Sequence, residues 1–117
     1  MTPNIKIVDL QKRFQEEYTY LHLRFFRILS PGEGFATIKK FCDPDSEMGA
    51  ALKMKKHGQI NISGTMKVSE LVEEFYNTYG IHAQVFRKSA NLWMEITLTN
   101  NWTLTQQNNH GREISVQ

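Results

Sequence analysis

Two stretches of this sequence decide its fold: KIVDLQKRFQEEYTYLHLRFFR at residues 6–27 and KVSELVEEFYNTYGIHAQVFR at residues 67–87. In each stretch, apolar residues first recur at helical spacing and then alternate with polar residues, as in a strand that is buried on one side. Phe14 in the first stretch corresponds to Phe75 in the second. The sequence therefore predicts that a helix followed by a strand occurs twice.

The two halves of the chain match at further points, and the matches keep one order. Three such pairs are His22 with His82, Asp43 with Thr103, and His57 with His110. Because the order is kept, we interpret the chain as a tandem duplication with repeats at residues 1–63 and 64–117. A single repeat of about 55–60 residues would be only marginally stable through its own burial, so we expect both to share a core and pack as one domain, residues 1–117.

Each repeat is expected to form a helix, two strands, a second helix and a third strand. In the first repeat the second helix is predicted to begin at Asp43 and Pro44 and to end at Gly58, because these residues favour helix starts and stops. Its counterpart is predicted to run from a capping box at Thr103 to Gly111. The predicted fold class is α+β: a tandem duplication of a helix–strand–strand–helix–strand unit that forms one compact domain with pseudo-twofold symmetry.

Alternation along the expected strands separates an inward side from an outward side. The inward side is predicted to carry the apolar core residues Leu21, Leu23, Phe25, Ala83, Val85, Met94 and Ile96. The outward side combines aromatic rings with cationic and polar groups, and we predict that it is the ligand or partner surface. Its residues are His22, Arg24, Phe26, His82, Gln84, Phe86, Lys88 and Trp93, with Ile28 on the same side.

Three interpretations of this outward side are open. Helices could cover it, which would make its aromatic residues part of a second core. A second copy of the chain could bury it, or an edge strand could pair with another chain. Single-stranded nucleic acid could stack on the rings. The net charge of +2 favours the first two interpretations, because phosphate contacts supply most non-specific nucleic-acid affinity.

The composition is typical of a globular domain, since 40% of the 117 residues are hydrophobic and 22% are charged. No apolar run approaches the roughly 18–20 residues that span a bilayer, and the N-terminal residues lack the layout of a signal peptide. The single cysteine, Cys42, cannot form an internal disulfide, which favours a reducing compartment. We therefore expect a cytoplasmic protein with no membrane partner.

Enzyme motifs are missing from the sequence. It contains neither a phosphate-binding loop followed by Lys-Ser/Thr nor a Gly-x-Ser-x-Gly nucleophile elbow. Cys42 precedes a predicted helix, where the pKa of a thiol can be lowered, but a small half-buried residue at a strand-to-helix corner is the better interpretation. His22 and His82 could converge on a ligand or a metal, although duplication alone explains their pairing. We predict no catalytic, cofactor-binding or metal-binding residues and no cofactor.

One set of residues resembles a known pattern: Val85-Phe86-Arg87-Lys88-Ser89, Trp93, Trp102-Thr103-Leu104 and Gln107. Together they are similar to a family of small uncharacterised bacterial proteins with the pattern VFRKS...W...WTL..Q. The resemblance is mainly to residues 66–111 and departs from the pattern at Asn100-Asn101, where the family prefers acidic residues. It implies a compact cytoplasmic protein of no known activity, and it implies no site residues.

These observations predict a non-enzymatic binding or assembly module that self-associates as a homo-oligomer and binds protein. The alternative is single-stranded nucleic-acid binding through an aromatic and basic sheet face, with Phe26, Phe86 and Trp93 stacking on bases while Arg24 and Lys88 contact phosphates. An enzyme that uses His22 and His82 is the third interpretation.

Overall fold

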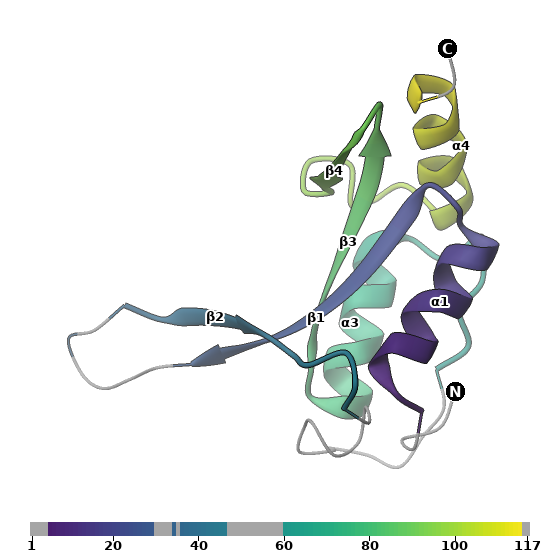
Figure 1. Ribbon diagram of the computed structural model, residues 1–117. Coiled ribbons are helices and arrows are strands. Elements are labelled where there is room, and N and C mark those ends of the chain that lie inside the picture. Colours follow the sequence, from purple (N-terminus) through teal and green to yellow (C-terminus); the bar gives the residue numbers. More distant parts are fainter. Residues whose placement is uncertain (1–4, 30–33, 35, 47–59, 116–117) are drawn as a thin grey trace.

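The computed structural model describes residues 5–29, 34, 36–46 and 60–115, and the structural statements below concern these residues. Helices and strands are mixed along this part of the chain, so the structure is α+β, as predicted (Figure 1). The elements are α1 (Ile7–Glu17), β1 (Leu21–Leu29), β2 (Ile38–Phe41), α3 (Val68–Tyr79), β3 (His82–Ser89), β4 (Leu92–Glu95) and α4 (Leu104–Ser115).

The four strands form one antiparallel sheet in the order β2-β1-β3-β4, so β1 and β3 are the central pair. The outer strands are short. β2 pairs with residues 26–29 of β1, and β4 pairs with residues 86–89 of β3. Each hairpin therefore extends beyond the central pair, and Figure 1 shows the two hairpins leaving it in different directions.

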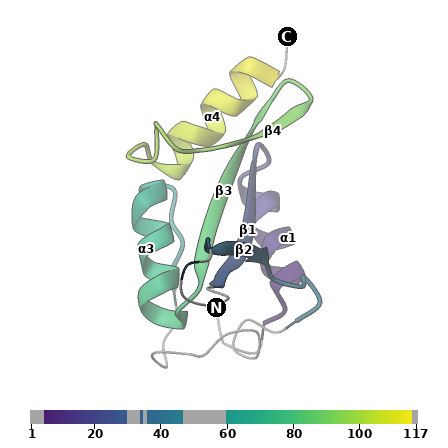
Figure 2. The same ribbon diagram turned by 90° about the vertical axis from the view of Figure 1, so that its left-hand side faces the viewer.

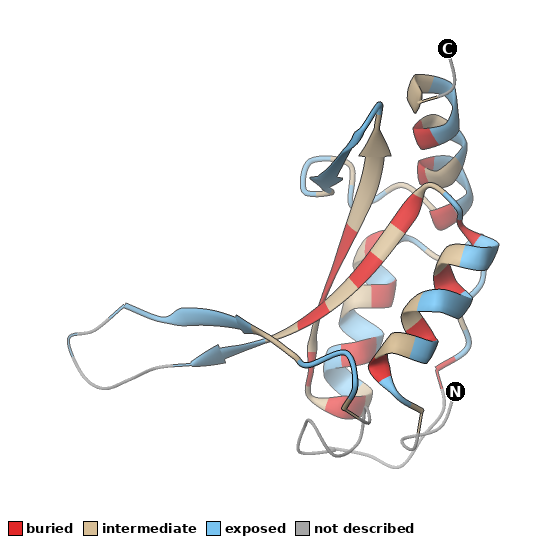
Figure 3. Cartoon of the chain, in the orientation of Figure 1, coloured by how far each residue is buried: buried red, intermediate tan, exposed pale blue. Residues whose placement is uncertain are grey.

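One face of the central pair forms the hydrophobic core. The inward residues of β1 and β3 are buried against α1 and α3, and Figure 3 shows buried positions alternating along β1. The predicted inward residues that are buried here are Leu21, Leu23, Phe25, Ala83 and Val85. On the same side of β3, the Arg87 guanidinium donates a hydrogen bond of 2.7 Å to Gln107 Oε1 of α4. All three described helices therefore pack on one face of the sheet.

The helical spacing seen in the sequence produces the apolar stripes that cover this face. Leu10 and Phe14 of α1 are buried, as are Leu71 and Phe75 of α3. Phe75 packs edge-on against Phe25 of β1, with ring centroids 4.9 Å apart. Burying each of these side chains contributes about 1.5–3 kcal/mol to folding, so the stripes rather than helix propensity hold α1 and α3 in place.

The start of α4 has the predicted capping box. The Thr103 N–H donates to Gln106 Oε1 at 2.9 Å, and the Gln106 N–H donates to Thr103 Oγ1 at 3.1 Å. The two bonds satisfy donors that a helix start would otherwise leave without partners. The capping box therefore fixes where this helix begins after the loop that follows β4.

The prediction that α4 ends at Gly111 is wrong. The helix continues through Gly111 to Ser115, so none of the described residues after the glycine forms a strand, and residues 60–63 form no strand either. Gly111 is buried because α4 crosses close to Tyr20. A Cβ atom at this position would lie 2.8 Å from the Tyr20 Cβ and 3.1 Å from the Arg87 Cγ. The glycine permits close packing and does not mark a helix end.

The prediction that Met94 belongs to the core is also wrong. Met94 is 50% exposed, and every residue of β4 is exposed. The reason is that β4 is an edge strand that pairs only with the last four residues of β3, while α3 and α4 pack mainly on β3. Ile96, which follows β4, does pack against the core, as predicted.

The helix predicted from Asp43 to Gly58 lies mostly outside the described residues, as does His57. In the described part, residues 43–46 form a turn in which Asp43 Oδ1 accepts a hydrogen bond of 3.0 Å from the Asp45 N–H. The Ser46 N–H and hydroxyl also donate to the Asp43 carbonyl. Asp43 thus acts as a local capping residue for this turn.

Replacing Gly111 with Ala adds a methyl group that would force α4 away from Tyr20 and Arg87, which costs about 1–3 kcal/mol. Helix propensity returns about 1 kcal/mol, so we expect a net destabilisation of up to about 2 kcal/mol. Chemical denaturation measures the change, with the exposed Asn109→Ala in the same helix as the control. A Gly111→Ala variant more stable than the wild type would contradict the packing described here.

Candidate functional site

The second face of β1 and β3, together with β4, has no described helix over it. We call this surface the open face. Figure 2 looks toward it, with β1 and β3 in front of α1. The strand register brings every predicted surface residue to this face, because Arg24 pairs with Gln84 and the flanking residues follow in alternation. The eight residues are His22, Arg24, Phe26, His82, Gln84, Phe86, Lys88 and Trp93.

At the end of the open face near β4, three side chains form a cluster of rings. The His22 ring centroid lies 5.5 Å from that of Trp93 and 6.2 Å from that of Phe86. Both contacts are tilted rather than parallel. His22 of β1 therefore contacts one larger ring on β3 and one on β4.

At the opposite end of the face, Phe26 is the centre of a second cluster. It stacks on His82 with centroids 5.2 Å apart and planes 16° apart, and it meets Phe41 of β2 edge-on at 6.0 Å. The ring of Tyr76 in α3 also contacts His82, with centroids 5.1 Å apart. The two aromatic clusters occupy opposite ends of one surface.

Two cations lie directly over rings in the second cluster. The Arg24 Cζ is 3.5 Å from the centroid of Phe41, and the Lys39 Nζ is 4.4 Å from the centroid of Phe26. Such contacts hold positive charge against an aromatic face without a carboxylate partner. The open face is therefore both aromatic and cationic.

Sequence reasoning missed Phe41, Lys39 and Tyr76. Phe41 and Lys39 alternate correctly for an outward side of β2, and that alternation could have identified them. Tyr76 comes from α3, so no strand pattern could have placed it at this face.

Gln84, in the middle of the open face, is buried to all but 7% of its surface. Its side-chain oxygen Oε1 has no hydrogen-bond partner. A buried acceptor without a partner costs about 1–3 kcal/mol, so this position favours a ligand or partner that donates a hydrogen bond. Gln84 is the most enclosed of the predicted surface residues.

The paired histidines do not converge. His22 lies opposite Phe86, and His82 lies opposite Phe26, so the Arg24–Gln84 pair separates the two imidazoles. Within the described ranges, no group of three or more His, Cys, Asp or Glu residues could hold a metal ion. His110 lies in the interior of α4, where it packs edge-on against Trp102 at 5.6 Å, and it does not belong to the open face.

Cys42 is a half-buried residue that packs against the core just after β2. Burial raises the pKa of its thiol, and the nearby Arg27 only partly opposes this effect. A raised pKa leaves little thiolate at neutral pH, which is the reactive form. This supports the structural interpretation of Cys42 over the reactive one.

Apolar side chains are exposed on both hairpins. Ile28, Leu29 and Ile38 are 51%, 41% and 53% exposed on the first hairpin. The second hairpin exposes Leu92, Trp93 and Met94. β2 and β4 are the edge strands of the sheet, and such edges offer unpaired backbone groups to another chain.

Comparison with family models, with curated proteins and with solved structures found no match to this chain. Among the helices of the described residues, none has the length and apolar character needed to cross a bilayer.

His22 makes stability depend on pH. Burial, and secondarily the charge of Arg24, lower the pKa of His22 below its ordinary value of 6.5. The unfolded chain therefore binds a proton at this residue more readily than the folded chain does. As the pH falls through 6.5, the free energy of unfolding is expected to decrease.

Denaturant titrations at several pH values below neutrality measure this effect, and His22→Gln is expected to reduce the pH dependence. NMR titration of the imidazole measures its pKa directly. A pKa above the ordinary histidine value, or an unchanged pH dependence in the variant, would contradict the assigned burial.

Proposed function

We propose that this chain is a non-enzymatic binding or assembly module that self-associates and binds protein through its open face. The observation that carries the proposal is that this face has large aromatic groups while every described helix packs on the other face. A helix that covered the face would have made these rings a second core. In the described part of the chain, no such layer is present.

The exposed apolar residues of the hairpins support a protein partner. Ile28 lies on the open face beside Lys39, and Trp93 lies on it beside Lys88. Contiguous exposed apolar groups rimmed by charge mark protein interaction surfaces. The hairpins thus extend the aromatic surface at both ends, and both can contact a bound chain.

For the self-association, we propose that a second copy of the chain binds to this surface. The edge strands β2 and β4 can pair with the same strands of another copy, and a twofold interface uses one patch twice. The open face carries both cationic side chains and the carboxylate of Glu95. Two copies related by a twofold axis can therefore place Glu95 of each against cations of the other.

We also propose that the chain is a tandem duplication of residues 1–63 and 64–117. Hydrogen bonds at the starts of α1 and α3 support it. The Ile7 N–H donates to the Ser46 carbonyl at 2.9 Å, and the Val68 N–H donates to the Trp102 carbonyl at 3.1 Å. In the next residues, Val8 donates to Pro44 and Ser69 donates to Asn100. Each first helix is thus joined in the same way to the segment after its hairpin.

The hairpins support the duplication as well. The Cys42 N–H donates to Phe25 at 2.9 Å, and the Ile96 N–H donates to Val85 at 3.0 Å, so both hairpins end with the same bond. In the central ladder, two matching pairs are Phe26 with His82 and His22 with Phe86. These pairs fit a pseudo-twofold axis that passes between Arg24 and Gln84.

The setting of the protein follows from its composition and its resemblance. We propose a cytoplasmic location, because the single cysteine favours a reducing compartment. The similarity of residues 66–111 to small bacterial proteins is consistent with this proposal.

Single-stranded nucleic acid is the second candidate partner. The observation that favours it is the placement of Arg24 over Phe41 and of Lys39 over Phe26. Cations beside exposed rings can contact phosphates while bases stack on the aromatic groups. The small net charge of +2 ranks this candidate below a protein partner.

Self-association is tested by sedimentation velocity over a wide concentration range. The wild type is expected to form a dimer, and Ile28→Glu is expected to weaken it about tenfold or more, because a carboxylate would replace an exposed apolar contact of the first hairpin. Leu98→Glu is the control, since Leu98 is exposed but lies outside both hairpins. A wild-type chain that remains monomeric at every concentration would rule out the proposal.

Nucleic-acid binding is tested with a labelled single-stranded oligouridine by fluorescence anisotropy. If this candidate is correct, the affinity falls steeply with added salt and Phe86→Ala weakens binding by about 1–3 kcal/mol. His110→Ala, outside the open face, is expected to leave the affinity unchanged. Absence of binding at low salt would remove this candidate.

A further inference from the structure

The outer edge of β3 is unpaired beside Ala83. Between β1 and β3, the even-numbered residues direct their backbone N–H and C=O groups toward the partner strand. The hydrogen bond from the Lys88 N–H to the Tyr20 carbonyl, just beyond the end of β1, follows this pattern. Odd-numbered residues therefore direct their N–H and C=O groups away from this ladder. Val85 uses its carbonyl there to bind Ile96, but in the described part of the chain no strand continues along β3 to Ala83.

The matching edge of β1 is closed by a side chain. The Leu23 carbonyl, like that of Ala83, points away from the ladder between β1 and β3. It accepts a hydrogen bond of 2.9 Å from Gln11 Nε2 of α1. Gln11 follows Leu10 in α1, and Val72 follows Leu71 at the matching position of α3. Valine has no donor. The second half of the chain therefore lacks the group that caps the edge in the first half.

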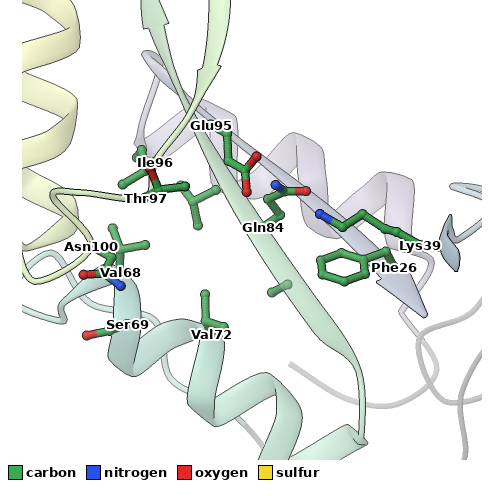
Figure 4. Close-up of a pocket in the computed structure, with 12 residues that line it drawn as sticks. Phe26, Lys39, Val68, Ser69, Val72, Gln84, Glu95, Ile96, Thr97 and Asn100 are labelled. Atoms are coloured by element: carbon green, nitrogen blue, oxygen red, sulfur yellow. The ribbon is translucent and has the colours of Figure 1, made fainter. Parts of the chain in front are cut away.

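A recess of about 350 Å³ occupies this place. Figure 4 shows that its lining comes from both sides of β3: from the start of α3, from the segment after β4, and from the open face. The wall beside α3 is apolar and consists of Val68, Val72, Ala83, Val85 and Ile96. A volume of this size accommodates a small ligand or one amino-acid residue with its flanking peptide groups.

The polar groups of the recess favour a neutral partner that donates hydrogen bonds. Gln84 lines the recess, and its buried Oε1 has no partner. Lys39 and Glu95 lie near Gln84 on the same side of β3, so one positive and one negative charge lie at the rim (Figure 4). Opposite charges at the rim do not select an anion such as a phosphate group.

We infer that this recess binds one residue of an extended peptide segment from a protein partner, as an added strand along the free edge of β3. The peptide N–H donates to the Ala83 carbonyl, and the peptide C=O accepts from the Ala83 N–H. An aliphatic side chain fills the wall formed by Val68 and Val72. This inference rests on the proposed protein-binding function and names the form in which the partner binds.

A peptide fits these features better than other ligands because it offers a donor and an acceptor at the spacing of a strand edge. Backbone pairing supplies affinity, and the apolar wall selects the side chain. A neighbouring peptide group can donate to Gln84 Oε1, which removes the cost of its missing partner. One partner segment thus satisfies the edge and the buried amide together.

The test uses the capped tripeptide acetyl-threonyl-valyl-threonine amide as the probe, titrated into the wild-type protein and followed by NMR of the backbone amides. The amides of Ala83, Val85 and Ile96 are expected to shift, whereas that of Leu23 is not, because its edge is capped. The same probe with an N-methylated valine lacks the donor to Ala83 and is expected to bind about tenfold more weakly or not at all.

Val72→Gln is expected to abolish probe binding, because it restores on α3 the cap that Gln11 provides on α1. Gln11→Val is the matched control and is expected to leave binding at Ala83 unchanged. Absence of shifts at Ala83 and Ile96, or equal binding of the N-methylated probe, would overturn the inference. Sedimentation of the same samples tests self-association separately, so a dimer without probe binding rejects the recess alone.

Discussion

The structure depends on the antiparallel pairing of β1 with β3. This pairing turns alternate residues of both strands toward α1 and α3, where Leu23, Phe25 and Val85 are fully enclosed. The remaining residues must point the other way because the side chains of a strand alternate. The core and the open face are therefore two consequences of one register, and a shift by a single residue would exchange them.

The open face is stabilised within the chain by contacts among its own side chains. Rings pack on rings at both ends, and Arg24 and Lys39 lie over aromatic groups instead of carboxylates. These contacts leave much of the apolar area on the hairpins exposed, and they leave the Gln84 oxygen without a partner. A bound chain would cover the exposed apolar area and donate a hydrogen bond to the Gln84 oxygen. The proposed function and the recess beside Ala83 are linked for this reason.

Periodicity in the sequence was sufficient for the elements that have a buried side. It located α1, α3 and the inward residues of β1 and β3, and it grouped His22 and Phe86 on one surface. Periodicity was not sufficient where the position of a residue depends on contacts with elements that are distant in the chain. A glycine such as Gly111 is typical of a helix end, but here it lets α4 pack closely against Tyr20. The sequence around Gly111 could not indicate this contact, because Tyr20 is distant in the chain. Met94 alternates correctly, yet it is 50% exposed because none of the described helices packs mainly on β4, so alternation could not reveal its exposure.

The most direct test of this account is the exposure of the open face in solution. Fluorine-labelled Phe26 and Phe86 can be observed by NMR with a soluble paramagnetic agent at low and high protein concentration. The agent is expected to broaden both signals in dilute solution, and a higher protein concentration is expected to protect them as a second copy covers the face. Protection that is complete at every concentration would contradict this account, because the chain itself would then cover the rings.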